Sequence, residues 1–233
     1  MCFVRVQGSL AVRTAIGDVL PLAVAAAISP FPIIGVALML VTPRARVNGP
    51  MFVMGWLAGL AAVGAIGLII VGAAGASDHG AASTGANVFE IVLGVLLLLF
   101  AIQQWRKRPK SGEQPEMPKW MSAVDHFSPW QAATLGVALA GVNPKNLILT
   151  LAAATSIAAT NLPGADQLIA FVIYALIATV GVAVPVIIFF TMGRRAAGIL
   201  DDLKTWLATN NAAIMAVIFA VIGTKVLGRG IAG

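Results

Sequence analysis

Cysteine is almost absent from this sequence, and charged residues are scarce. The 233 residues include a single cysteine, Cys2, which excludes a disulfide framework, a cysteine-rich metal site and an intramolecular thiol pair. Only 10% of the residues are charged, whereas soluble domains carry about 25%. Hydrophobic residues make up 59% of the chain, and the mean hydropathy is +0.94. This composition indicates a protein that lies in a lipid bilayer.

Motifs for nucleotide hydrolysis and for the common hydrolases are also missing. The sequence contains no Gly-x-x-x-x-Gly-Lys-Ser/Thr, no His-Glu-x-x-His and no Gly-x-Ser-x-Gly. His79 and His126 have no second ligand at metal spacing. We therefore expect no enzyme activity, no cofactor and no metal. The net charge of +6 comes from short loops between apolar runs, which argues against a nucleic-acid partner.

Six apolar runs approach or exceed the length of about 20 residues that a membrane-spanning helix needs. They lie at residues 19–41, 51–74, 86–105, 131–159, 168–192 and 205–227. The polar stretch 106–128 contains three prolines and is predicted to be a linker. The sequence thus predicts an all-α integral membrane protein with six transmembrane helices. Residues 1–105 form a first three-helix repeat, residues 106–128 a cytoplasmic linker and residues 129–233 a second three-helix repeat.

Lysine and arginine are distributed unevenly between the two sides of the predicted membrane protein. The loops after the first, third and fifth runs contain ten of these residues, and the opposite side contains four. The ten are Arg44, Arg46, Arg106, Lys107, Arg108, Lys110, Lys119, Arg194, Arg195 and Lys204. Because cytoplasmic loops carry the excess of positive charge, we predict that both termini lie outside the cytoplasmic membrane.

Two of the apolar runs contain a proline near their midpoint. Pro30 follows Val19 by 11 residues, and Pro144 follows Ala133 by 11 residues. At 1.5 Å per residue, both prolines lie about 16 Å into a hydrocarbon core roughly 30 Å thick. Proline lacks an N–H and disfavours helix in the residue before it. We predict that the first and fourth helices are broken at mid-membrane and that the two breaks face each other.

Each half of the chain contains three predicted helices, so the second half enters the membrane upside down relative to the first. Inverted repeats with broken helices are typical of secondary transporters, which bind substrate at the breaks. The predicted substrate site therefore lies between the two breaks. It consists of Ser29, Pro30, Pro32, Asn143, Pro144, Lys145 and Asn146. The alternative is that the prolines only kink their helices.

Two ionisable residues in the apolar runs are candidates for ion coupling. Lys145 lies near the centre of the fourth run, where a lysine costs ~2.5 to 3.5 kcal/mol on insertion scales, so it should face the interior and have a partner. It could contact an anionic group or couple to an ion, or it could donate to carbonyls freed by Pro144. Glu90 lies near the outer start of the third run. It could also couple an ion, although an acid there complements the helix dipole.

Four short motifs resemble a known family. They are ISPFP at 28–32, TPRAR at 42–46, GWLAG at 55–59 and NPKN at 143–146. The chain resembles the Sap/GAP family, the sulfolipid- and glycopeptidolipid-addressing branch of the LysE transporter superfamily. The resemblance implies a six-helix exporter in a bacterial cytoplasmic membrane, and it links some members to outward movement of surface glycolipids.

Three functions are compatible with these observations. The first is a secondary exporter or translocator of a small molecule or lipid, driven by an ion gradient or a partner pump. The second is a non-transporting scaffold subunit of a larger lipid-export machine, and the third is a LysE-like amino-acid exporter. The expected partners are the lipid bilayer and the cargo. The glycine-rich second run could support a homodimer, but it could equally pack within one chain.

Overall fold

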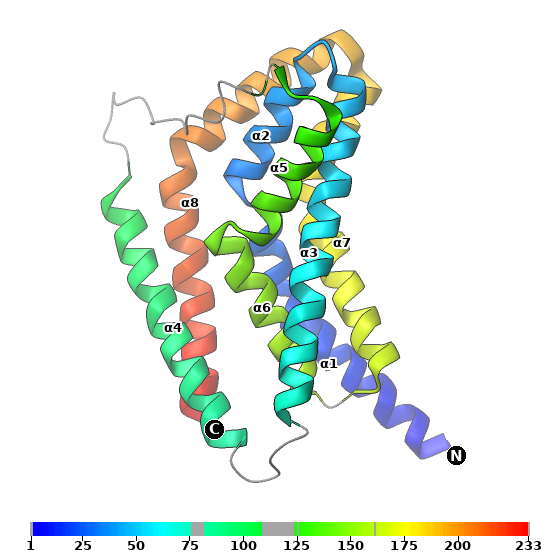
Figure 1. Ribbon diagram of the computed structural model, residues 1–233. Helices are drawn as coiled ribbons and strands as arrows, with labels where there is room; N and C mark the ends of the chain where they lie inside the picture. Colours follow the sequence, from blue (N-terminus) through cyan, green and yellow to red (C-terminus); the bar gives the residue numbers. More distant parts are fainter. Residues whose placement is uncertain (1, 76–81, 109–123, 125, 161, 233) are drawn as a thin grey trace. The chain divides into compact units, whose positions relative to one another are not determined.

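The computed structural model describes residues 2–75, 82–108, 124, 126–160 and 162–232, and within these ranges the chain is helical and contains no strand. The order is α1 (Cys2–Ala27), α2 (Pro30–Leu40), α3 (Ala45–Gly75), α4 (Ala82–Arg106), α5 (Pro129–Gly141), α6 (Pro144–Ala158), α7 (Gly164–Met192), the short η2 (Gly193–Arg195) and α8 (Ala196–Ala232). Figure 1 shows this arrangement. The expectation of an all-α protein is confirmed.

Several of these helices match the composition and length of membrane spans. Ala45–Ile70, Gly164–Met192 and Ala196–Ala232 are each long and apolar enough to cross a membrane. The described residues contain up to five spans if α1 with α2 counts as one bent span and α5 with α6 as another. The sequence predicts a sixth span over residues 86–105. In the part of α4 that the search covered, Ile91–Arg106 is apolar but shorter than a full span.

Two helices start well before the apolar runs that predict them. The first run begins at residue 19, whereas α1 begins at Cys2, and the last run begins at residue 205, whereas α8 begins at Ala196. The backbone hydrogen bonds of a helix continue past polar residues such as Asp201 and Lys204, because their side chains project outward from the helix. An apolar run therefore marks the part of a helix suited to lipid and not its ends.

The chain divides into two compact units, and each takes helices from both halves of the sequence. Unit 1 comprises Met1–Val71 and Pro118–Thr205, and unit 2 comprises Gly72–Met117 and Trp206–Gly233. Within unit 1, α7 packs along α1, α2 and α6, while α5 contacts α2 and α6. Unit 1 therefore contains both broken helices.

Unit 2 is built on a close pair formed by α4 and the later part of α8. A Cβ added at Gly94 of α4 would come within 2.6 Å of the backbone nitrogen of Leu227. Gly223 of α8 faces the carbonyl oxygen of Gly94 in turn, at 3.1 Å from such a Cβ. Small residues let the backbones of membrane helices approach this closely. Such close packing matters in lipid, because no hydrophobic force drives the helices together there.

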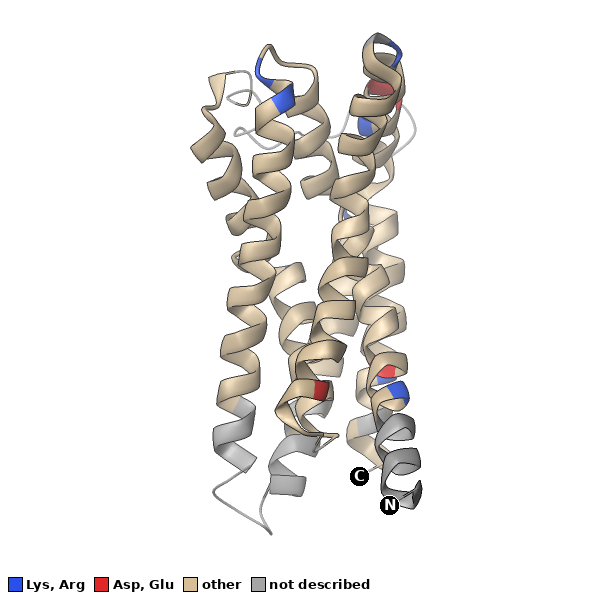
Figure 2. Ribbon diagram, turned by 90° about the vertical axis from the view of Figure 1, so that its right-hand side faces the viewer, with Lys and Arg blue, Asp and Glu red and all other residues tan. Residues whose placement is uncertain are grey.

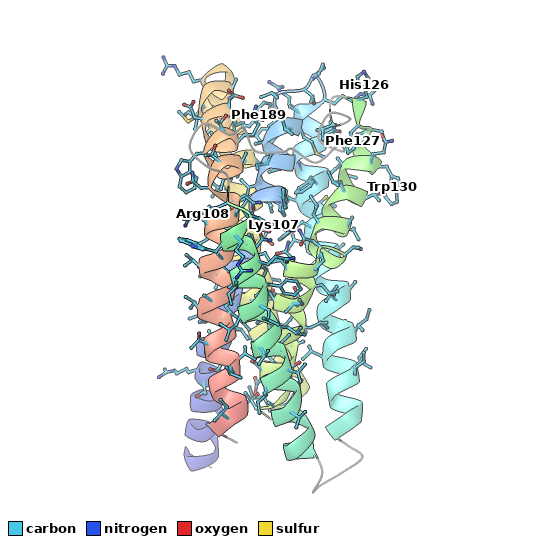
Figure 3. The ribbon with its side chains drawn as sticks, turned by 90° about the vertical axis from the view of Figure 1, so that its left-hand side faces the viewer. Lys107, Arg108, His126, Phe127, Trp130 and Phe189 are labelled. Atoms are coloured by element: carbon cyan, nitrogen blue, oxygen red, sulfur yellow. The ribbon has the colours of Figure 1, made fainter. Side chains whose placement is uncertain are left out.

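Several basic residues of unit 1 lie at the end of its bundle formed by the α2–α3 turn and η2 (Figure 2). Arg44 lies in the turn between α2 and α3, Arg46 lies in the first turn of α3, and Arg195 ends η2. At this end the side chain of Asn48 donates to the carbonyl oxygen of Phe127 at 2.9 Å, just before α5. Figure 3 shows Phe127 beside His126 and Trp130, and the Trp130 side chain is 75% exposed. An exposed indole next to basic turns suits the headgroup level of a bilayer.

The packing of α3 on α5 generates a prediction about Gly55. A Cβ at this position would overlap the backbone carbonyl of Ala133 on α5, and a backbone group cannot rotate away as a side chain can. We expect Gly55→Ala to lower the free energy of unfolding by about 1 to 3 kcal/mol. The melting temperature of the purified protein in detergent measures this effect. Gly17→Ala is the matched control, because nothing lies within 4 Å of its added Cβ, and an equal loss in both variants would contradict the prediction.

Candidate functional site

The first helix break lies between α1 and α2. α1 ends at Ala27, α2 begins at Pro30, and the two axes differ by 49°. Ser29 adopts an extended conformation between them. In a continuous helix, the carbonyl of Ile28 would accept from the N–H of residue 32, but Pro32 has none. The break therefore leaves the Ile28 carbonyl oxygen without a partner in its own helix.

The second break lies between α5 and α6, which are bent by 62°. Asn143 caps α6, since its side-chain oxygen accepts from the backbone N–H of Lys145 at 3.1 Å. The backbone N–H groups of Val142 and Asn143 both donate to the carbonyl of Ala138, at 2.8 and 3.1 Å. The carbonyl of Leu139, which would normally accept from residue 143, is thereby freed.

Side chains at the start of α6 satisfy the freed carbonyls of both breaks. The ammonium of Lys145 donates to the Ile28 carbonyl at 3.4 Å. The side-chain nitrogen of Asn146 donates to the Leu139 carbonyl at 2.8 Å and to the Ser29 hydroxyl at 3.3 Å. The prediction that the two breaks face each other is thus confirmed by direct contacts between them.

These polar groups are withdrawn from solvent. Ser29 is 2% exposed, Lys145 6% and Asn146 0%. Among the described residues, Lys145 forms no ion pair, and the side-chain oxygen of Asn146 is buried without a hydrogen-bond partner. A buried acceptor of this kind costs about 1 to 3 kcal/mol unless water or a ligand donates to it. The site therefore has one open acceptor and one buried cation.

The charge of Lys145 is placed between two helix ends of opposite sign. It is the second residue of α6, whose N-terminus carries a partial positive charge that disfavours a cation. Its ammonium reaches instead to the end of α1, where the carbonyls carry partial negative charge. The contact with Ile28 therefore compensates for the unfavourable position of the lysine on its own helix.

α7 completes the site, and the sequence reasoning did not predict this. Thr150 donates to the backbone carbonyl of Asn146 at 2.7 Å, and its oxygen lies 3.0 Å from the hydroxyl of Tyr174 on α7. Gly181 of α7 lies directly against the carbonyl oxygen of Ala27, where a Cβ would overlap it. One signal was available for Tyr174, since it is the only tyrosine of the sequence and lies in mid-span.

The structure brings together most of the residues predicted for the site, though not all of them. Pro30 and Pro32 are buried, whereas Pro144 is exposed and Asn143 is partly exposed. Glu90 belongs to α4, but its side chain lies outside the part of the chain that the structure describes. The described residues contain no group of three histidine, cysteine or acidic residues that could hold a metal ion.

The double role of Asn146 generates a prediction. Asn146→Ala removes the donor for Ser29 and leaves the partly buried Leu139 carbonyl without its partner. We expect the free energy of unfolding to fall by about 1 to 3 kcal/mol. The control is Asn210→Ala, because Asn210 donates to the Trp206 carbonyl at an exposed position, where a change within about 0.5 kcal/mol is expected. Thermal melting in detergent compares the two, and equal melting temperatures would contradict the prediction.

Comparison with known proteins identifies a family for this chain. A family model described as "Sap, sulfolipid-1-addressing protein" matches residues 19–232. The searches of curated proteins and of solved structures found no match. The matched range begins within α1 and ends at the last residue of α8, so it includes both breaks and every residue of the site. The chain belongs to the Sap, or sulfolipid-1-addressing protein, family.

Proposed function

We propose that the protein is a secondary exporter or translocator that moves a lipid or small molecule across the cytoplasmic membrane, with its cargo site at the two helix breaks. The observation that carries this proposal is the contact between the breaks through Lys145 and Asn146. Interrupted helices whose ends meet are the usual binding place of secondary transporters. Family membership supports a role in lipid handling.

The proposal includes six spans in two inverted repeats. In this arrangement α1 with α2 corresponds to α5 with α6, α3 corresponds to α7, and α4 corresponds to α8. The similar position of the two breaks, each with a polar residue followed by proline, supports the correspondence. The excess of basic residues in the loops that follow α2, α4 and α7 supports a cytoplasmic location for those loops and an outer location for both termini.

The charge at the site favours some cargoes over others. A lysine that is 6% exposed and has no ion pair among the described residues repels a cation strongly, because the surroundings have a low dielectric constant. This argues against export of basic amino acids in the manner of the LysE branch. The unpartnered oxygen of Asn146 in turn favours a cargo that carries a hydroxyl or amide donor.

A transport assay tests the cargo site. We expect Lys145→Ala and Asn143→Ala to reduce export of surface lipid or of an effluxed solute at least tenfold, at equal amounts of protein in the membrane. The control is Lys204→Ala, because Lys204 pairs with Asp201 at an exposed position of α8. Full export from stably inserted Lys145→Ala and Asn143→Ala would refute the proposal. If deletion of residues 109–119 abolished export in the same assay, the scaffold function would replace it.

The orientation of the chain can be tested with introduced cysteines, because the sequence has only one cysteine to remove. In a Cys2→Ser background, a cysteine introduced by Gly233→Cys should react with a membrane-impermeant maleimide in intact cells. One introduced by Ser111→Cys should react only after the membrane is permeabilised, since the linker is expected in the cytoplasm. The reverse pattern of labelling would show that both termini are cytoplasmic.

A further inference from the structure

One face of α4 presents a row of exposed branched side chains, here called the α4 stripe. Its members recur at the three- and four-residue spacing that places residues on one face of a helix. They are 42 to 57% exposed and comprise Val88, Val92, Val95, Leu99 and Ile102. The opposite face of α4 holds Gly94, Leu97 and Ala101, which are buried. Within the described residues, the stripe is thus the side of α4 that protein does not cover.

The α4 stripe ends in basic residues. Arg106 follows Ile102 by four residues and so continues the stripe, and Lys107 and Arg108 come directly after it. All three are exposed, and Figure 3 labels the last two at the end of α4. The guanidinium carbon of Arg108 lies 4.1 Å from the centroid of the Trp105 ring, which is a cation–π distance. Trp105 is itself 50% exposed, as suits an indole at the headgroup level of a bilayer.

The positive charge at this end has no acidic residue near it in the sequence. No aspartate or glutamate occurs between Glu90 and Glu113. Basic residues in the last turn of a helix complement its dipole, and Arg106 can serve in this way. The dipole effect falls off outside the last turn, so it does not account for the two further charges that follow. Three consecutive exposed cations at the headgroup level therefore fit an anionic partner.

We propose that the α4 stripe and its basic end bind an anionic phospholipid, with an acyl chain along the stripe and the phosphate at Arg106, Lys107 and Arg108. Basic segments next to a membrane helix attract anionic headgroups. From Val95 to Arg106 the helix rises about 16 Å, which is about half of a hydrocarbon core roughly 30 Å thick. The lower part of the stripe thus matches the depth of one leaflet. This site belongs to unit 2 and does not depend on the proposed transport function.

Two features favour a lipid over a second protein helix at the stripe. Packed membrane helices meet at small residues, and the small residue Gly94 of α4 is already turned to Leu227 of α8. The stripe itself contains only valine, leucine and isoleucine. A second copy of the chain, packed in parallel on the same face, would also bring its own Arg106 beside this one, and like charges repel. An acyl chain meets neither obstacle.

The experiment measures melting temperatures of the purified, delipidated protein in detergent as phosphatidylglycerol or phosphatidylcholine with the same acyl chains is added. Phosphatidylglycerol should raise the melting temperature of the wild type by about 2 to 4 °C more than phosphatidylcholine does. Inorganic phosphate at the same ionic strength should not reproduce this rise, because it lacks the acyl chain. Arg106→Gln/Lys107→Gln/Arg108→Gln should need at least tenfold more phosphatidylglycerol for the same rise.

The matched control is Arg44→Gln/Arg46→Gln/Arg195→Gln, which removes the same charge from exposed residues of unit 1. It should keep the response of the wild type to phosphatidylglycerol. An equal loss in both triple variants would show that only net charge matters and would overturn the proposal. Equal shifts of the wild type with the two lipids would overturn it as well.

Two further measurements do not rely on the glutamine variants. In the wild type, the preference for phosphatidylglycerol should shrink when NaCl is raised from about 0.05 M to about 0.5 M, because salt screens exposed charges, and an unchanged preference would contradict the proposal. In Cys2→Ser/Leu99→Cys, oxidation in membranes should leave the protein monomeric, because lipid covers the stripe. Disulfide-linked dimers would instead place a second copy there and overturn the proposal.

Discussion

The fold of unit 1 depends on the need to satisfy backbone carbonyls inside a medium that offers no water. Lipid cannot donate hydrogen bonds, so a broken helix is tolerated only where protein groups replace the missing donors. Pro32 has no N–H to donate to the Ile28 carbonyl, and the N–H of Asn143 donates to the Ala138 carbonyl and not to that of Leu139. Lys145 and Asn146, two adjacent residues of α6, satisfy both carbonyls. The first break is thus stabilised by side chains of the second, whereas the second satisfies its own freed carbonyl.

The hydrogen bonds at the site fall into two groups of different length. Those within the second broken helix are the shorter ones, at 3.1 Å from Lys145 to Asn143 and 2.8 Å from Asn146 to Leu139. Those that cross from α6 to the first break are 3.4 and 3.3 Å. Hydrogen bonds weaken toward such lengths. The contacts between the two broken helices are therefore weaker than those that hold the second break together.

The positions of both breaks could be predicted from the sequence, because proline acts locally on its own helix. The location of Ser29, Lys145 and Asn146 at the breaks also followed, since polar side chains in an apolar run have few places to go, while their part in binding cargo stays a prediction. The contribution of Tyr174 and Gly181 could not be predicted in this way. Both act through the packing of α7 on α1 and α6, and no break or polar motif in the sequence marks α7 as the neighbour of these helices.

The starts of α1 and α8 were misplaced for a related reason. Hydropathy reports whether a side chain prefers lipid or water, whereas the end of a helix is set by where its backbone hydrogen bonds stop. The exposure of Pro144 is a smaller difference of the same kind. A proline can break a helix through its backbone while its ring faces away from the site that the break creates.

The contact of Gly181 with Ala27 closes one flank of the first break to water. The backbone of α7 lies against that carbonyl so closely that not even a methyl group fits between them. A water molecule is about as large as a methyl group and needs hydrogen-bond partners, so it is excluded on this flank. At the end of α1, the backbone of α7 therefore takes the place that water would need on this flank.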